Sequence, residues 1–270
     1  MGVDMSKIKR QIDWIVEATK LNMKAMFEYR SAFMMQVIGM MINNTAFVLV
    51  WYLFFKIFTN VNGWEFKEMI AINGLVAMVY GLVFSFAHGT RQISRYITYG
   101  QLDRYLVWPK NVLLGVILSE VSISAVGDLF FGLVSLLVYF IMSGFGWPQL
   151  FLMPILLFLA VTIFVSFLIV SQSVAFWIPN SEELSSALFE FLLGPSLYPN
   201  SSYVGAVRLF FTFVVPSLFI SGVPINILLK PNWQMVLFML VVACFWLILS
   251  IKVFKLGLKR YESGNLVGIK

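Results

Sequence analysis

The residues from Leu150 to Trp177, LFLMPILLFLAVTIFVSFLIVSQSVAFW, contain no charged side chain. A helix needs about 20 apolar residues to cross the hydrocarbon core of a bilayer, so this stretch predicts a transmembrane helix. The whole chain of 270 residues is 60% hydrophobic and only 12% charged, whereas a soluble domain has about 25% charged residues. Because lipid offers no partner for backbone groups, helices satisfy them internally. The sequence therefore predicts an all-α membrane protein.

Long apolar stretches on both sides of this segment predict five more crossings, which gives six transmembrane helices in all. Residues 1–30 are polar, with an apolar stripe at helical spacing, and predict an amphipathic helix lying on the membrane surface. Residues 257–270 form a polar tail. The transmembrane domain covers 31–256, and its six predicted spans lie at about 31–55, 69–88, 111–142, 150–177, 204–228 and 234–256.

The basic residues set the expected orientation. Six crossings place both chain ends on one side, and residues 179–203 are then read as a loop on that side with a short amphipathic helix at 182–193. All but Lys56, Lys67 and Lys230 of the 19 basic residues fall on the side of the chain ends, with Arg208 counted among them. Cytoplasmic loops carry such an excess. We expect both ends to be cytoplasmic, in the inner (plasma) membrane of a bacterium, and the net charge of +6 to reflect topology and not a nucleic-acid partner.

Motifs of several enzyme classes are missing. The chain lacks the G-x-x-x-x-G-K-[ST] phosphate loop, the H-E-x-x-H zinc motif and the G-x-S-x-G nucleophile elbow. It has one histidine and one cysteine, Cys244, so it offers neither a two-histidine metal site nor a disulfide framework. We expect no enzymatic activity and no metal or other cofactor bound by this chain, so uphill transport would draw energy from a partner or an ion gradient.

Two carboxylates lie inside a predicted span. Glu120 and Asp128 are eight residues apart, which separates them by about 80° around a helix, and Ser124 lies between them. Ionisable groups in hydrocarbon are candidate functional sites. They line a translocation path or form hydrogen bonds between helices, and the sequence leaves both readings open. Pro216 and Pro224 likewise predict either an outer gate or a static kink in the fifth span.

The loop after the second span reads HGTRQISRYITYGQLDRYLVWP from His88 to Pro109. Arg91 and Arg95 are one helical turn apart, Gly100 breaks the helix, and the apolar residues Leu102, Tyr105 and Leu106 give a short second helix one apolar face. This pattern fits a docking element on the cytoplasmic surface, and it also fits an ordinary basic loop anchored by aromatic residues.

The same loop resembles a known family. Residues 99–109, YGQLDRYLVWP, are similar to the G-x-L-D-x-x-L-x-x-P loop of permeases of type-two ATP-binding-cassette (ABC) transporters, in their exporter group. Further residues are similar in order and spacing to that group: Ala175-Phe176-Trp177, Tyr198-Pro199, Arg208, Pro216, Pro224 and the ending GLKRYESG at 257–264. The resemblance covers nearly the whole chain.

The resemblance implies a half-transporter that pairs with a second permease, identical or related, and with two cytoplasmic ABC ATPase subunits. ATP and Mg would be held by those ATPases, and membrane lipid surrounds the chain. Residues 1–30 would be a connecting helix, and the loop at about 89–110 a coupling helix that contacts the ATPase. The coupling residues are then Arg91, Arg95, Gly100, Leu102, Asp103, Tyr105, Leu106 and Pro109.

Two other functions compete with an ATP-driven exporter. An ion-coupled secondary carrier would use Glu120 and Asp128 as proton sites, but many carriers show repeated halves, and the sequence shows none. A membrane enzyme acting on lipid ranks last, because no cluster of His, Asp and Arg lies at an interface. No set of residues assigns the substrate.

Overall fold

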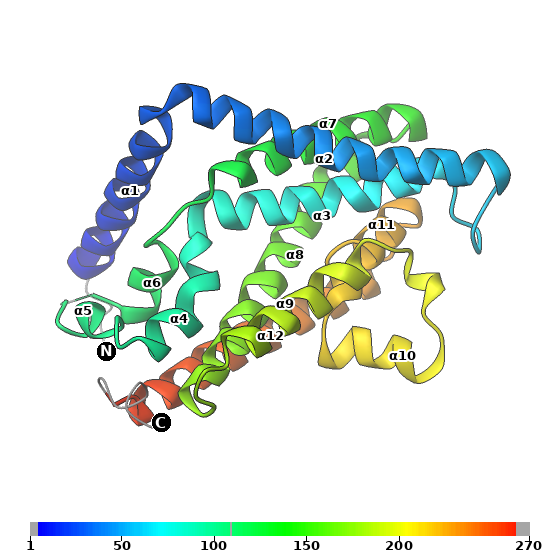
Figure 1. Cartoon of the computed structure of the whole chain (residues 1–270). Helices are drawn as coiled ribbons and strands as arrows, with labels where there is room; N and C mark the ends of the chain where they lie inside the picture. Colours follow the sequence, from blue (N-terminus) through cyan, green and yellow to red (C-terminus); the bar gives the residue numbers. More distant parts are fainter. Residues whose placement is uncertain (1–4, 109, 263–270) are drawn as a thin grey trace.

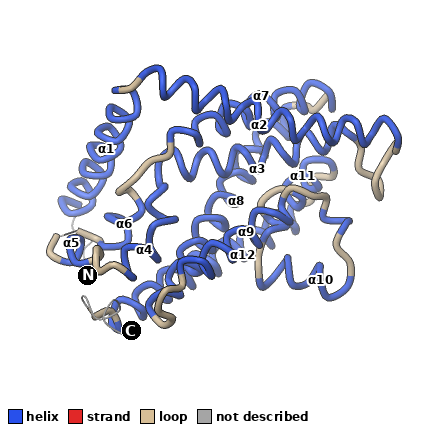
Figure 2. The backbone as a smooth tube through the Cα atoms, in the orientation of Figure 1, coloured by secondary structure: helices blue, strands red, loops and turns tan. Residues whose placement is uncertain are grey.

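A computed structural model describes residues 5–108 and 110–262, and these form helices joined by turns (Figures 1 and 2). The all-α prediction is confirmed for this part of the chain. The α-helices are α1 (Met5–Glu28), α2 (Arg30–Ile57), α3 (Phe66–Ala87), α4 (Ile93–Thr98), α5 (Asp103–Leu106), α6 (Val112–Ile117), α7 (Ile123–Ser143), α8 (Trp147–Ser173), α9 (Glu182–Ser196), α10 (Gly205–Leu209), α11 (Gly222–Leu229) and α12 (Trp233–Arg260).

Five helical segments in the described residues are long and apolar enough to cross a membrane. They are Arg30–Ile57, Phe66–Thr98, Ile123–Ser143, Trp147–Phe176 and Trp233–Arg260. Each overlaps one predicted span. The second of these is the most deeply buried, because α3 packs between α2, α7 and α8.

Glycines allow α3 and α7 to approach closely. A Cβ atom added at Gly81 would lie 2.5 Å from the backbone nitrogen of Leu129, and one added at Gly132 would lie 2.6 Å from that of Met78. Small residues permit this close packing in membranes. There the hydrophobic effect does not drive helices together, so van der Waals contacts contribute much of the association. The two helices therefore form a closely packed pair at the centre of the bundle.

The bundle has two ends. At one end, which we call the Tyr96 end, lie α4, α5 and α6, together with Trp14 of α1, whose ring centroid is 6.5 Å from that of Trp108. The last turn of α12 also reaches this end, where Tyr261 packs against Phe176. The loop between α2 and α3 marks the opposite end, which we call the Asn62 end.

The predicted span at 111–142 is not one helix. It consists of α6 and α7, separated by non-helical backbone between Leu118 and Ser122. The freed backbone groups find partners on other helices: Asn22 Nδ2 donates to the Leu118 carbonyl at 2.9 Å, and the Ser122 N–H donates to the Phe84 carbonyl at 2.8 Å. These bonds make the break possible inside an apolar bundle.

The path of residues 179–203 also differs from the prediction. The short helix is present as α9, but it does not lie in a loop at the Tyr96 end. Ser185 Oγ near its start donates to the Ser171 carbonyl of α8 at 3.2 Å, whereas Asn62 Nδ2 contacts the Ser201 carbonyl at 3.5 Å just beyond its end. The 15 residues of α9, about 22 Å of helix, thus run from one end of the bundle toward the other.

The predicted span at 204–228 is replaced by short elements at the Asn62 end. After α10, residues 210–214 form a π-helical turn that ends at Val215, and α11 begins only at Gly222. Pro216 lies in this break, where it has no helical hydrogen bond to remove. Pro224 lies in the first turn of α11, where a missing N–H costs no helical bond. The structure thus gives a broken, packed segment in place of a single kinked helix.

Candidate functional site

The loop from η1 (His88–Gln92) to α6 is held against the core of the bundle by its apolar side chains. Leu102 is fully buried and Tyr105 is 5% exposed, and both belong to a core cluster with Ile169 of α8 and Phe254 of α12. The prediction that Leu102 and Tyr105 form an apolar face is confirmed. Leu106, the third residue of that predicted face, is instead 43% exposed.

The turn between α4 and α5 depends on Gly100. Its φ is +69°, a left-handed conformation that costs other residues about 1 kcal/mol or more. Its N–H donates to the Ile97 carbonyl at 3.3 Å, and the Leu102 N–H donates to the Tyr96 carbonyl at 3.1 Å. This turn carries Leu102 back into the core and leaves Arg104 and Leu106 of α5 exposed.

The predicted coupling residues separate into outward and inward groups. Arg95 and Leu106 are exposed at the Tyr96 end. Arg91 is half-buried, and its guanidinium carbon lies 4.5 Å from the ring centroid of Phe189 on α9. Arg91 therefore connects the loop to α9. Pro109 lies outside the described residues.

Asp103 of the loop lies close to Tyr261, the residue that follows α12. Burial, together with the nearby Asp103 carboxylate, raises the pKa of the Tyr261 phenol above its ordinary value. Tyr261 follows the last residue of α12, and its ring is 6.3 Å from that of Phe176. The loop, the end of α8 and the end of α12 thus meet at one place.

The three residues predicted as one acidic face are divided by the break before α7. Glu120 Oε1 accepts a hydrogen bond from the Tyr96 hydroxyl at 2.6 Å, which ties it to the loop. Ser124 Oγ lies 3.0 Å from Ser122 Oγ, within the same segment. Asp128 is buried on α7 and accepts a hydrogen bond from Asn44 Nδ2 at 2.7 Å. Glu120 and Asp128 therefore do not act on a common helix face.

The candidate gate residues Pro216 and Pro224 are both buried at the Asn62 end. The hydroxyl of Ser221, between them, donates to the Ser196 carbonyl at the end of α9. Asn226 Nδ2 of α11 donates to Asn200 Oδ1 at 3.1 Å. The two prolines thus belong to a cap held against the end of α9.

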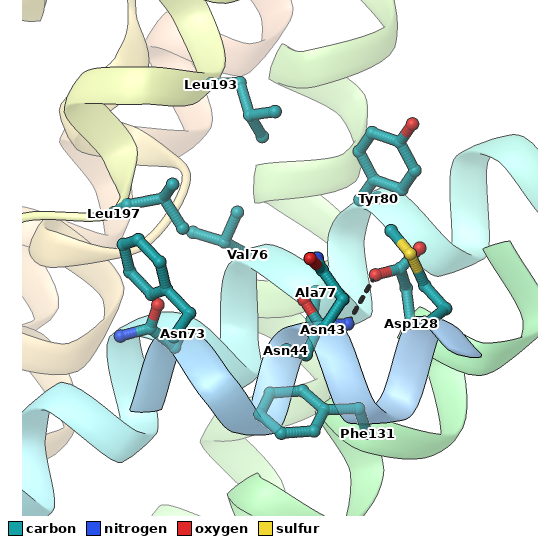
Figure 3. Close-up of a pocket in the computed structure, with 12 residues that line it drawn as sticks. Asn43, Asn44, Asn73, Val76, Ala77, Tyr80, Asp128, Phe131, Leu193 and Leu197 are labelled. Atoms are coloured by element: carbon teal, nitrogen blue, oxygen red, sulfur yellow. Dashed lines mark hydrogen bonds between the residues drawn. The ribbon is translucent and has the colours of Figure 1, made fainter. Parts of the chain in front are cut away.

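A cavity of about 220 Å³ lies between α2, α3, α7 and α9, and Figure 3 shows its lining. Asp128 faces it together with Asn43, Asn44 and Asn73. Asp128 was predicted from the sequence as a candidate site residue, but the three asparagines were missed. The adjacent pair Asn43-Asn44 in a charge-free span was the available signal. Among the described residues, no group of three or more His, Cys, Asp and Glu side chains could hold a metal ion.

The sequence profile described as "ABC-2 family transporter protein" matches residues 41–265, more than four fifths of the chain. The chain belongs to the ABC-2 family. The match includes the anchored loop, Phe176 and the end of α12, the elements that converge at the Tyr96 end. No curated protein sequence matches the chain. As an ABC-2 protein without a nucleotide-binding motif, it is a membrane permease component of an ABC transporter.

Proposed function

We propose that this ABC-2 permease is half of the membrane path of an ATP-driven exporter. The observation that carries the proposal is the family match together with the anchored loop at the Tyr96 end. Separate ATPase subunits would hold ATP and Mg and supply the energy. The chain ends and most basic residues would face the cytoplasm of a bacterial cell, consistent with the positive-inside rule.

The outward side of the loop supports its assignment as the ATPase-docking surface. Arg95, Gln101, Arg104 and Leu106 are exposed there. Leu102 and Tyr105 fix the loop to α8 and α12 from the inside. Movement of a docked ATPase would therefore be transmitted directly to two long helices, as the proposed coupling requires.

The surface of α2 supports a second permease as partner. Only 6% of the most apolar 18-residue stretch of this helix is buried within the chain. Two of its exposed residues, Gln36 and Asn43, are polar and seven positions apart, so they share one face of the helix. Polar groups facing lipid are unfavourable, and a second copy or a related permease would cover this face.

The ion-coupled carrier loses its main support in the structure. That mechanism requires Glu120 and Asp128 to act on one path, but Glu120 is bonded to Tyr96 in the loop and Asp128 to Asn44 in the bundle. We therefore favour the ATP-driven exporter.

Copurification tests this proposal. The tagged chain is coexpressed with an ABC ATPase encoded beside its gene, and the complex is assayed for bound ATPase and ATP hydrolysis. We expect the ATPase to copurify, and the double variant Arg95→Glu, Leu106→Asp to lose it. The control Lys230→Glu changes an exposed charge outside the loop and should retain it. Transport that persists without any ATPase and follows an ion gradient would overturn the proposal.

A further inference from the structure

The wall of the cavity beside Asp128 contains both polar and apolar groups. Three asparagines and the carboxylate line it, and the rest of its wall is apolar or aromatic, including Phe131 and Tyr80. Asn43 is exposed on the surface of α2. The cavity therefore reaches the face of α2 that the second permease would cover.

The carboxylate of Asp128, which lines the cavity, has unused hydrogen-bonding capacity. The side chain is 3% exposed, and Oδ1 accepts from Asn44 Nδ2 at 2.7 Å. Its other oxygen, Oδ2, is buried and has no hydrogen-bond partner among the described residues. A carboxylate can accept about four hydrogen bonds, and a buried acceptor without a partner costs about 1–3 kcal/mol, or more when charged. The hydrogen bond from Asn44 to Oδ1 does not compensate the cost of burying Oδ2 without a partner.

The lining selects the charge of a ligand. Among the described residues it contains no lysine, arginine or histidine, so none of their cationic side chains compensates Asp128 within the cavity. A carboxylate repels anions and binds a cationic donor strongly. Aromatic rings in the wall, such as Phe131, also favour a cation. The missing group is therefore a cationic hydrogen-bond donor.

We propose that this cavity binds the protonated amine of an amphipathic substrate, with the ammonium donating to the Asp128 carboxylate. This inference rests on the proposed exporter function and names its substrate class. The volume of about 220 Å³ is below the roughly 300–1,000 Å³ of pockets for drug-sized ligands. The cavity thus holds the charged end of such a molecule, and its apolar part extends toward α2.

Binding of two matched probes tests the proposal on the purified permease without its ATPase. The probes are dansylcadaverine, which carries a primary ammonium, and its N-acetylated derivative, which is neutral. We expect the wild-type protein to prefer the amine by about tenfold, the scale of one charged hydrogen bond. Asp128→Asn keeps an oxygen for Asn44 but loses the charge, and it should remove the preference. Equal binding of both probes by the wild type would overturn the proposal.

Two further variants test whether the amine lies in this cavity and not at another carboxylate. Glu183→Gln removes an exposed carboxylate that does not line the cavity, and it should keep the tenfold preference. Ala77→Leu fills cavity space without changing Asp128 and should weaken binding of the amine; unchanged binding would place the amine elsewhere and overturn the proposal. Size-exclusion profiles and melting temperatures identify variants that misfold. Because the ATPase is absent, failure here would leave the exporter proposal and its copurification test unaffected.

Discussion

At the scale of single residues, Gly257 shows how closely the end of α12 packs against the end of α8. A Cβ atom added at this position would lie 2.1 Å from the nearest ring atom of Phe176. Neither partner has room to move easily, because the Phe176 ring also packs against Phe254 and Tyr261. The glycine is therefore required by packing and not by an unusual backbone conformation.

We predict that Gly257→Ala destabilises the chain by about 1–3 kcal/mol, the usual cost of overpacking, although alanine favours helices more than glycine. Thermal unfolding of the purified permease in detergent measures the change. The matched control is Gly39→Ala, since an added Cβ at Gly39 meets nothing within 4 Å. This control should be neutral or slightly stabilising, and equal loss of stability in both variants would contradict the packing argument.

Tyr261, at the Tyr96 end, makes the stability of the folded chain depend on pH in the alkaline range. Because burial and Asp103 raise the pKa of its phenol in the folded chain, the neutral form is favoured on folding. The stabilising contribution is fully present below about pH 10, the pKa of the unfolded chain, and is lost as pH rises further. We predict that Tyr261→Phe loses less stability than the wild type between pH 9 and 11, as followed by thermal unfolding. Tyr99→Phe, which changes an exposed tyrosine, should behave like the wild type.

At the scale of elements, α4 and α5 divide into an anchoring side and a contacting side. We predict that Leu102→Ala costs about 2–5 kcal/mol of stability, since it leaves a cavity at a fully buried position. Leu106→Ala should change stability by less than about 0.5 kcal/mol, as is usual at exposed positions. Its effect should instead be weaker association with the ATPase. Thermal unfolding and copurification, measured on both variants, separate the two roles; equal destabilisation by both would contradict the division.

Hydropathy predicted the long helices because α2, α3, α8 and α12 are continuous apolar runs. It missed the path of α9, since Glu182, Glu183 and Glu190 made this helix look like a surface segment. Its buried positions Ser185, Phe189, Leu192 and Ser196 form a stripe that only tertiary packing reveals. The break between α6 and α7 was missed for a related reason: Asn22 and Phe84 stabilise the backbone at 118–122 through bonds between residues far apart in sequence.

The candidate site was predictable to the extent that it is local. Gly100 and Leu102 follow from a turn and an apolar spacing within a few residues. The proximity of Asp103 to Tyr261 was not predictable, because Tyr261 lies far along the chain. For the same reason the sequence identified Asp128 as unusual but not its cavity, which four separate helices enclose.

At the scale of the whole molecule, the path of α9 changes where one basic residue lies. The sequence alone places Arg208 with the cytoplasmic residues, because residues 179–203 are predicted as a cytoplasmic loop. In the structure Arg208 is exposed on α10, after the contact of Ser201 with Asn62. The side of the chain ends keeps its excess of basic residues, so the expected orientation is unchanged. Only the location of Arg208 is reversed.

Cysteine accessibility in intact cells distinguishes these two topologies. In a Cys244→Ser background we predict that a membrane-impermeant maleimide labels Arg208→Cys and Lys67→Cys from outside, and labels Arg95→Cys only after the cells are permeabilised. The reason is that α9 carries the chain from the Tyr96 end to the Asn62 end, so α10 lies on the same side as the loop between α2 and α3. If Arg208→Cys behaved like Arg95→Cys, α9 would not cross the membrane. In that case residues 204–228 would have to supply the crossing despite their break at Pro216.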